Sequence, residues 1–270
     1  MNHQRRAPWE VMFAAVFAIV IRDIQKKFIT SVNTHRVFGF FWLVFEPISH
    51  IGIWIFIRTF LRSTHQTTMS APLFVLLGAM PFLFFRNVVN FSKASIKNNK
   101  NFYIFRQIKP IDPIIAKLIS ELIVSILIFI LILLGFSWFD VEWKLYNLSF
   151  WLINIVAFSL FLLGFALMLS VACFFFHFVQ VLLGIAMRLV YLFCGVFFSA
   201  EMLPPSLREI MLYNPIFQFI ELTRECFQPE YFTSYASSDY LIEVALIFLV
   251  LGLALYLTLR QKIMIEIEQR

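Results

Sequence analysis

Length, composition and charge place the chain in one broad class. It has 270 residues, of which 61% are hydrophobic and only 14% are charged. A soluble domain does not carry so large an apolar fraction, so the composition predicts an all-α, polytopic membrane protein with a single membrane domain. The formal net charge of +6 would suit an anionic partner. Membrane topology accounts for most of that charge. The net charge is therefore no argument for nucleic-acid binding, and no other feature of the sequence supports such binding.

The first apolar run is short and lies between basic residues. Residues 11–21 are apolar, and the flanking basic residues are Arg5, Arg6, Arg22, Lys26 and Lys27. Positive charge directly after an apolar run opposes translocation, so a secretory signal is disfavoured. The pattern predicts an in-plane helix at the cytoplasmic membrane surface, over residues 8–28.

Six longer apolar runs are predicted to cross the membrane. They cover residues 37–61, 71–91, 113–136, 149–176, 179–199 and 240–259. Sixteen Lys and Arg residues lie near the N-terminus, between the second and third spans and at the C-terminus, against five on the other side. The excess of basic residues predicts that both termini are cytoplasmic.

The segment 93–109 is the longest polar insertion on the predicted cytoplasmic side. It combines basic with aromatic residues, namely Lys93, Lys97, Arg106, Phe102, Tyr103 and Phe105. One interpretation is a short amphipathic helix that presents aromatic side chains to a protein partner. The other is a basic anchor on lipid headgroups.

The stretch 195–227 begins like a membrane span and is then interrupted by three prolines. Ser206 with Glu209 matches a capping box, and Asn214 is a good N-cap before Pro215. These signals predict two short helices, both too short to cross the membrane, as a periplasmic re-entrant pair within residues 200–227. The charges of this stretch fit either the rim of a transport path or internal ion pairs.

Ionisable residues inside predicted spans are candidates for a transport path, because they usually face protein or water. In the first span one helical face carries Trp42, Glu46, Ser49, His50 and Ile53. In the fifth span one face carries Gly184, Arg188, Tyr191, Gly195 and Ser199. Either face could line a pore or hold helices together. In the structural alternative Arg188 pairs with Glu121 or Glu46, while Glu121 could instead pair locally with Lys117.

Motifs for catalysis are absent from the sequence. It contains no G-x-x-x-x-G-K-[ST], no HExxH and no GxSxG, and its five histidines form no metal-spaced pair. The three cysteines show no CxxC spacing and are expected to be free thiols. We therefore expect no enzyme activity and no cofactor in this chain. A membrane-embedded lipid or sugar transferase is the alternative of a different class.

Several stretches, taken in order, resemble the membrane subunit of type 2 ABC exporters, and among them the capsular-polysaccharide export permeases of Gram-negative bacteria. The stretches are DIQKKF (23–28), RVFGFFWLVFEP (36–47), GAMPFLFFRNVV (78–89), QIKPID (107–112), GVFFSAEMLP (195–204) and YNPIFQFIELTR (213–224). The resemblance covers nearly the whole chain. Its Glu-Pro and Asn-Pro motifs are also similar to those of O-antigen and teichoic acid permeases. Export of O-antigen, of teichoic acid or of a small hydrophobic cargo is therefore the alternative to export of capsular polysaccharide.

The resemblance implies half of a homodimeric pore in the bacterial inner membrane. Two separate ATP-binding subunits would bind ATP and Mg²⁺ and dock beneath it. Residues 8–28 resemble the gate helix of the family, and residues 93–109 resemble its coupling helix. The implied cargo is a lipid-linked, acidic polysaccharide. The implied further partners are a periplasmic co-polymerase-like protein and an outer-membrane export channel.

Two sets of candidate residues follow from the spans and the resemblance. The expected substrate path contains Trp42, Glu46, His50, Arg58, Arg62, Arg188, Tyr191 and Arg224. The expected ATPase-coupling set contains Lys26, Lys27, Lys93, Lys97, Phe102, Tyr103, Phe105 and Arg106. In the first set the arginines would contact an acidic polymer, and Trp42 and Tyr191 would be pore aromatics.

Overall fold

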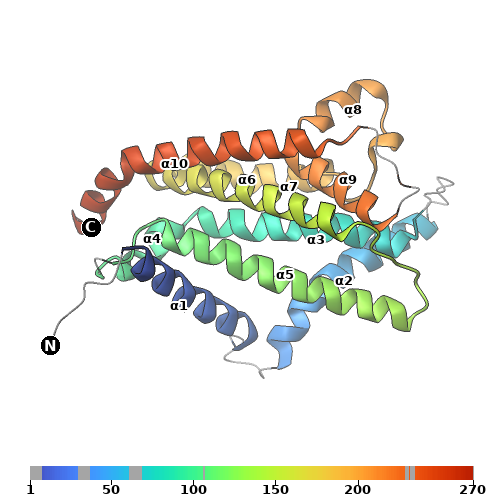
Figure 1. Cartoon of the computed structure of the whole chain (residues 1–270), viewed down its shortest axis with the longest axis horizontal. Helices are drawn as coiled ribbons and strands as arrows, with labels where there is room; N and C mark the ends of the chain where they lie inside the picture. The colour runs from blue at the N-terminus through green and yellow to red at the C-terminus, as the bar shows by residue number, and fades with distance from the viewer. Residues whose placement is uncertain are drawn as a thin grey trace.

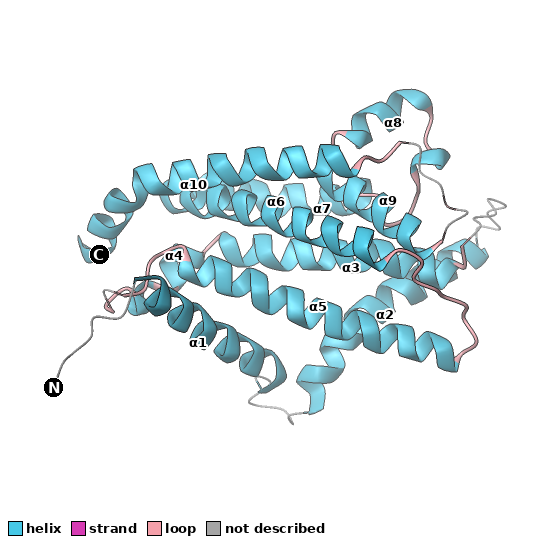
Figure 2. Ribbon diagram, viewed as in Figure 1, coloured by secondary structure: helices cyan, strands magenta, loops and turns pink. Residues whose placement is uncertain are grey.

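The protein is helical throughout the part of the chain that the structure describes. This computed structural model describes residues 8–29, 37–60, 69–105, 107–228, 231 and 235–269. Figure 2 shows helices joined by loops, without a strand in these ranges. The predicted all-α membrane class is confirmed.

The described elements follow the apolar runs closely. They are α1 (Pro8–Ile29), α2 (Val37–Phe60), α3 (Ala71–Ser92), α4 (Ser95–Asn98), η1 (Lys100–Phe102), α5 (Asp112–Trp138), α6 (Leu148–Phe175), α7 (His177–Phe193), η2 (Ala200–Met202), α8 (Pro205–Leu212), α9 (Pro215–Phe227) and α10 (Ser238–Gln269). Figure 1 shows α4 and the end of α10 at one end of the bundle, and α8 and α9 at the other. The long helices run between these two ends.

Helix α3 is the centre of the bundle. It packs against α2, α5, α6 and α9, and Figure 1 shows it between α5 and the α6–α10 pair. Most of its side chains are buried, including Phe74, Leu77 and Val88. By contrast, α5 and α10 expose leucine and isoleucine along their outer faces, for example Leu134 and Ile247. A bundle that is apolar on its outside is suited to lipid rather than to water.

Four of the described helices are long and apolar enough to cross a membrane. These are α3, α5, α6 and α10. Helix α7 is apolar but has only 17 residues, and about 20 are needed to cross the hydrocarbon core. The chain is a multi-pass membrane protein, and the number of six spans stays a prediction.

The predicted fifth span, 179–199, is wrong at its C-terminal end. Helix α7 stops at Phe193, and Gly195 follows with a φ of +88°. That left-handed conformation suits glycine, which has no Cβ, and it ends the helix six residues before the predicted end of the span. The two later residues of the predicted face, Gly195 and Ser199, therefore do not belong to α7.

The two short helices predicted after the prolines are present as α8 and α9. Asn214 caps α9 as predicted, since its Oδ1 accepts a hydrogen bond from the backbone N–H of Ile216 at 3.0 Å. The capping box at Ser206 is wrong. Helix α8 begins at Pro205 after Pro204 as N-cap, without a side-chain bond, so Ser206 lies inside the helix. Their re-entrant position in the membrane stays a prediction.

Candidate transport and coupling site

Glu121 of α5 is a buried carboxylate with two lysine partners. Its side chain is 2% exposed, Lys27 Nζ lies 2.5 Å from Oε2, and Lys117 Nζ lies 2.7 Å from Oε1. Lys117 is one turn earlier on the same helix, as one of the sequence alternatives proposed. Lys27 comes from α1, so the same carboxylate also attaches the predicted interfacial helix to α5.

The attachment of α1 combines charge with apolar packing. Burial lowers the pKa of Lys27, and the charge and hydrogen bond of Glu121 oppose that shift. Beside this ion pair, Ile19 and Val20 of α1 are buried against Ala116 of α5. The two interactions together fix α1 on α5.

Two residues of α3 extend these polar contacts to α2. Asn87 Nδ2 donates to Glu121 Oε2 at 3.3 Å. Arg86 Nη2 donates to Asn87 Oδ1 at 3.2 Å and to Glu46 Oε1 at 2.5 Å. The result is an unbroken series of contacts from α1 through α5 and α3 to α2. We call this series the polar relay, and its members are Lys27, Glu46, Arg86, Asn87, Lys117 and Glu121.

His50 connects α2 to α7 one turn beyond Glu46. Its Nδ1 lies 2.5 Å from the hydroxyl oxygen of Tyr191, and the Tyr191 ring also packs against Phe82 of α3. Glu46, His50 and Tyr191 are all partly exposed. The structure thus brings together three of the residues predicted for the substrate path.

Arg188 lies one turn before Tyr191 on α7 and is exposed. Within the described ranges it takes part in no ion pair and no hydrogen bond. The alternative in which it pairs with Glu121 or Glu46 is wrong, because those carboxylates bind Lys27, Lys117 and Arg86 instead. The exposed guanidinium of Arg188 can therefore donate hydrogen bonds to a ligand.

Arg224 has a different environment, although the sequence prediction grouped it with Arg188. Its side chain is 0% exposed, its Nη1 donates to Glu221 Oε1 at 2.9 Å, and its guanidinium lies 3.6 Å from the centre of the Phe74 ring. Tyr231 donates its hydroxyl to the same Glu221 carboxylate at 2.9 Å. These residues form a fully buried polar cluster under α9.

The Arg224 cluster explains how the chain leaves α7. Arg224 donates to the carbonyl oxygens of Gly195 at 2.7 Å, Val196 at 3.1 Å and Phe198 at 3.1 Å. Those carbonyls follow the end of α7 and are not bonded within that helix, so the guanidinium replaces the missing partners. In this structure Arg224 therefore stabilises the turn into α8 and α9 and does not face a transport path.

The segment after α3 turns only part of its predicted aromatic patch outward. Tyr103 is buried at 6% exposure, and Phe102 packs under the guanidinium of Arg22 at 4.4 Å. Phe105 is 64% exposed, next to Ile104 at 78%. The apolar surface available to a protein partner is therefore made by Ile104 and Phe105.

The basic residues of the same segment have mixed environments. Lys93 Nζ donates to Asn90 Oδ1 at 2.7 Å, Lys97 is partly buried, and Lys26 of α1 is exposed. Gln180 of α7 donates to the Lys93 carbonyl oxygen at 2.8 Å. The segment that follows α3 is thus bonded to α7, the helix that carries Arg188.

Four predicted residues fall outside the described part of the structure. Arg62 and Arg106 lie between the described ranges, and Trp42 and Arg58 belong to α2 at positions whose side chains are not described. Their predicted contacts with polymer or ATPase stay predictions.

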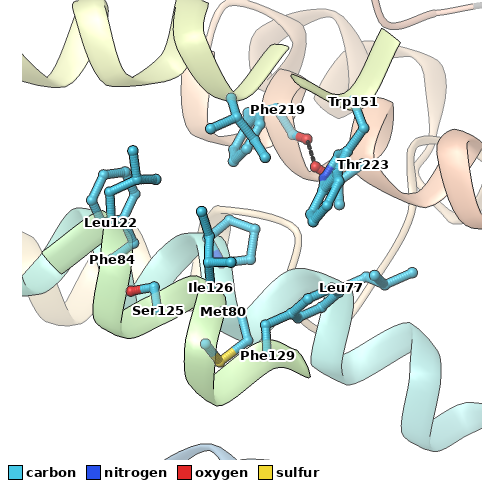
Figure 3. A pocket seen from close by; sticks show the side chains of 12 residues that line it. Leu77, Met80, Phe84, Leu122, Ser125, Ile126, Phe129, Trp151, Phe219 and Thr223 are labelled. Atoms are coloured by element: carbon cyan, nitrogen blue, oxygen red, sulfur yellow. Dashed lines mark hydrogen bonds between the residues drawn. The ribbon is translucent and has the colours of Figure 1, made fainter. Parts of the chain in front are cut away.

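An apolar cavity lies within the bundle, and none of the relay residues lines it. It has a volume of about 60 Å³ and is lined by α3, α5, α6 and α9, with Met80, Phe129 and Phe219 among its walls (Figure 3). A cavity of this size holds no sugar ring, and its walls offer almost no polar groups. It is therefore not a candidate for a polysaccharide path.

Several residues of the site could not be identified from the sequence. In the sequence Arg86 contributes only to the excess of basic residues that predicts topology, and Asn87, Gln180 and Tyr231 carry no signal that distinguishes them from ordinary polar residues. Arg86 and Asn87 do lie in an otherwise apolar helix, and such residues usually face protein or water. That feature is the one signal that could have placed them in the relay.

We expect Glu121→Gln to loosen α1. Lys27 and Lys117 would lose their counter-charge while their side chains remain only 16% exposed, at a cost of about 3 kcal/mol. The measurement is thiol labelling of Val20→Cys, at the buried α1–α5 contact, in a background with Cys173, Cys194 and Cys226 replaced by Ala. Labelling should become faster in the Glu121→Gln background.

The matched control is Glu243→Gln, which neutralises an exposed carboxylate on α10 outside the relay. Labelling of Val20→Cys should be unchanged in that background. Equal labelling rates in all backgrounds would show that Glu121 does not fix α1.

Comparison with known proteins identifies the family. A family model described as ABC-2 type transporter matches residues 14–227. The polysialic acid transport protein KpsM of Escherichia coli is 29% identical over 94% of this chain and 96% of its own length. The capsule polysaccharide export inner-membrane protein CtrC of Neisseria meningitidis is 27% identical over 86% and 87% of the two chains. BexB of Haemophilus influenzae, described in the same words, is 23% identical over 86% and 87%. The chain therefore belongs to the ABC-2 type transporter family of membrane proteins.

Proposed function

We propose that this protein is the membrane permease subunit of an ATP-driven exporter for capsular polysaccharide. It works in the bacterial inner membrane with both termini in the cytoplasm. Supporting this, its relatives are capsule export and polysialic acid transport proteins that align with it over almost their whole length. The cargo is a lipid-linked acidic polysaccharide, and ATP and Mg²⁺ bind to a separate subunit.

The polar relay is the observation that carries the proposal. A permease without a nucleotide-binding motif does not hydrolyse ATP by a P-loop of its own. Movements of the ATP-binding subunits must therefore be transmitted to it through contacts at its surface. The relay connects α1 with Glu46 of α2, and the His50–Tyr191 contact connects α2 with α7. A displacement of α1 by the ATP-binding subunits would therefore reach α2 and α7. Those helices carry the partly exposed residues of the candidate path.

The positions of these segments also suggest where the partner proteins would bind. Ile104 and Phe105, exposed after η1, offer an apolar contact to the ATP-binding subunit, and Lys26 and Lys97 add positive charge. Two copies of the chain form the pore, with α2 and α7 on the shared side. A periplasmic co-polymerase-like protein and an outer-membrane channel receive the polymer beyond α8 and α9.

We expect Arg188→Ala to reduce the export of polymer while leaving the protein intact. The exposed guanidinium would contact acidic groups of the cargo, and a charge-assisted hydrogen bond lost there corresponds to about a tenfold decrease. The measurement is surface polymer per cell, with the membrane level of the protein and its co-purification with the ATP-binding subunit measured in parallel.

Arg188→Lys is the matched control, since it keeps the charge and should retain most of the export. Normal polymer in Arg188→Ala would contradict the role of Arg188. Failure of that variant to accumulate would make Arg188 a structural residue.

The alternative functions give different results. Export of O-antigen, teichoic acid or a small hydrophobic cargo predicts a loss of that product and not of capsule when the gene is deleted. A lipid or sugar transferase predicts activity of the purified chain without any ATP-binding subunit. Co-purification of a P-loop protein that depends on Ile104 and Phe105 would argue against the transferase.

A further inference from the structure

A basic cavity lies between α1, the segment after α3 and the start of α5. Its volume is about 420 Å³. Its lining includes Arg22, Asp23, Lys26, Lys27, Phe102 and Lys117. Four of these side chains are basic and one is acidic. With Glu121 counted as the partner of Lys27 and Lys117, the cavity keeps an excess of two positive charges.

Several donors around this cavity are available to a ligand. Lys26, Asn98 and Asn101 are exposed, and within the described ranges no hydrogen bond or ion pair occupies their side chains. The Arg22 guanidinium is held over the Phe102 ring at 4.4 Å, and its Nη2 already donates to Asp23 Oδ1 at 3.1 Å, whereas its buried Nε has no partner in the described part of the chain. A stacked guanidinium combined with lysine and amide donors is suited to a phosphate group.

The other side of α1 indicates where such a phosphate would come from. Trp9, Phe13, Phe17 and Ile21 are spaced four residues apart and are all exposed, Phe13 at 71% and Phe17 at 61%. An apolar stripe of this kind on an interfacial helix lies among acyl chains. Ile21 immediately precedes Arg22, so the C-terminal end of the stripe and the cavity lie at the same level along α1, on different faces of the helix. A ligand with an anionic head and an acyl tail can therefore use both surfaces.

We propose that the cavity binds the phosphate of an anionic glycerophospholipid from the cytoplasmic leaflet, which joins α1 to the segment that contacts the ATP-binding subunit. The bound lipid would bridge Arg22 and Lys26 of α1 to Asn98 and Asn101 of the segment after α3. The proposal depends on the placement of α1 at the membrane surface and is independent of the cargo.

The test uses the purified full-length chain in a neutral detergent. Short-chain phosphatidylglycerol is titrated while thermal unfolding is followed, and native mass spectrometry counts the lipids that remain bound. Phosphatidylcholine and inorganic phosphate are titrated in the same way. We expect a saturable rise in melting temperature with phosphatidylglycerol, and no such rise with phosphatidylcholine or inorganic phosphate. Arg22→Gln combined with Lys26→Gln should weaken the apparent affinity about tenfold.

Two further variants keep the test decisive. Lys26→Gln alone removes an exposed side chain, so it should fold normally and still weaken binding. Lys109→Gln combined with Arg260→Gln removes two charges at another cavity on the surface of the chain and should leave binding unchanged. Equal losses in this control and in the cavity variants would overturn the site.

The source of the phosphate is tested by the other titrations. An equal rise with inorganic phosphate would overturn the lipid assignment, and an equal rise with phosphatidylcholine would overturn the requirement for a negative headgroup. Because the readout involves neither polymer nor ATP, a failure here leaves the export function intact. A failure of Arg188→Ala to affect export likewise leaves the lipid site intact.

Discussion

Arg224→Ala is expected to prevent the protein from accumulating in the membrane. The substitution leaves Glu221 as a buried carboxylate without its cation, and it leaves the carbonyls of Gly195, Val196 and Phe198 without donors. Removing one partner of a buried ion pair costs about 3–5 kcal/mol, which is a large part of the stability of a typical domain. The measurement is the amount of monodisperse protein extracted from membranes by mild detergent.

Two comparisons show whether the cost arises from the unpaired charge. Arg188→Ala removes an exposed arginine and should leave the extracted amount unchanged. Glu221→Gln combined with Arg224→Ala removes both charges and should recover part of the yield, because no carboxylate is then left unpaired in the interior. Normal accumulation of Arg224→Ala alone would show that the buried cluster does not stabilise the turn after α7.

Gly164→Ala is expected to destabilise the protein strongly, as is Gly252→Ala on the facing helix. Helices α6 and α10 form the most extensively packed pair in the structure, and the two glycines face each other where these helices meet. A Cβ at Gly164 would overlap the backbone of Phe248, and one at Gly252 would overlap the backbone of Gly164. A backbone neighbour cannot move aside as a flexible side chain can, so we expect a cost of about 3 kcal/mol.

The matched control for this prediction is Gly135→Ala in α5. A Cβ at that position meets nothing within 4 Å, and alanine favours a helix by about 1 kcal/mol over glycine. Thermal unfolding of the detergent-solubilised variants is the measurement. Gly135→Ala should melt at the wild-type temperature or above it, whereas equal melting temperatures for Gly135→Ala and Gly164→Ala would refute close helix packing.

The two candidate arginines show where reasoning from sequence reaches its limit. The sequence predicts both Arg188 and Arg224 on the substrate path, since each lies in or next to an apolar segment. The structure leaves Arg188 exposed and buries Arg224 completely. The difference depends on the end of α7, which Gly195 fixes, and on carbonyl groups 26 to 29 residues away in sequence. No local pattern around Arg224 contains that information.

Features that depend only on neighbouring residues can be predicted from the sequence without any tertiary information. The length of an apolar run sets whether a helix can reach across a membrane. Helices α3, α5 and α6 lie within two residues of the predicted runs, whereas α10 begins where predicted and continues past residue 259 to Gln269. Asn214 before Pro215 defined the start of α9 for the same reason, because an N-cap acts on the next turn of its own chain.

The pairing of charges, by contrast, depends on how the helices pack. Glu121 meets Lys27 across 94 residues, and Arg86 meets Glu46 across 40. The choice between such partners is a matter of distance and burial after the helices have packed, since both the attraction between two charges and the cost of removing them from water are largest where water is excluded. For that reason the polar relay, the buried position of Arg224 and the basic cavity beside α1 emerged only when the helices were placed together.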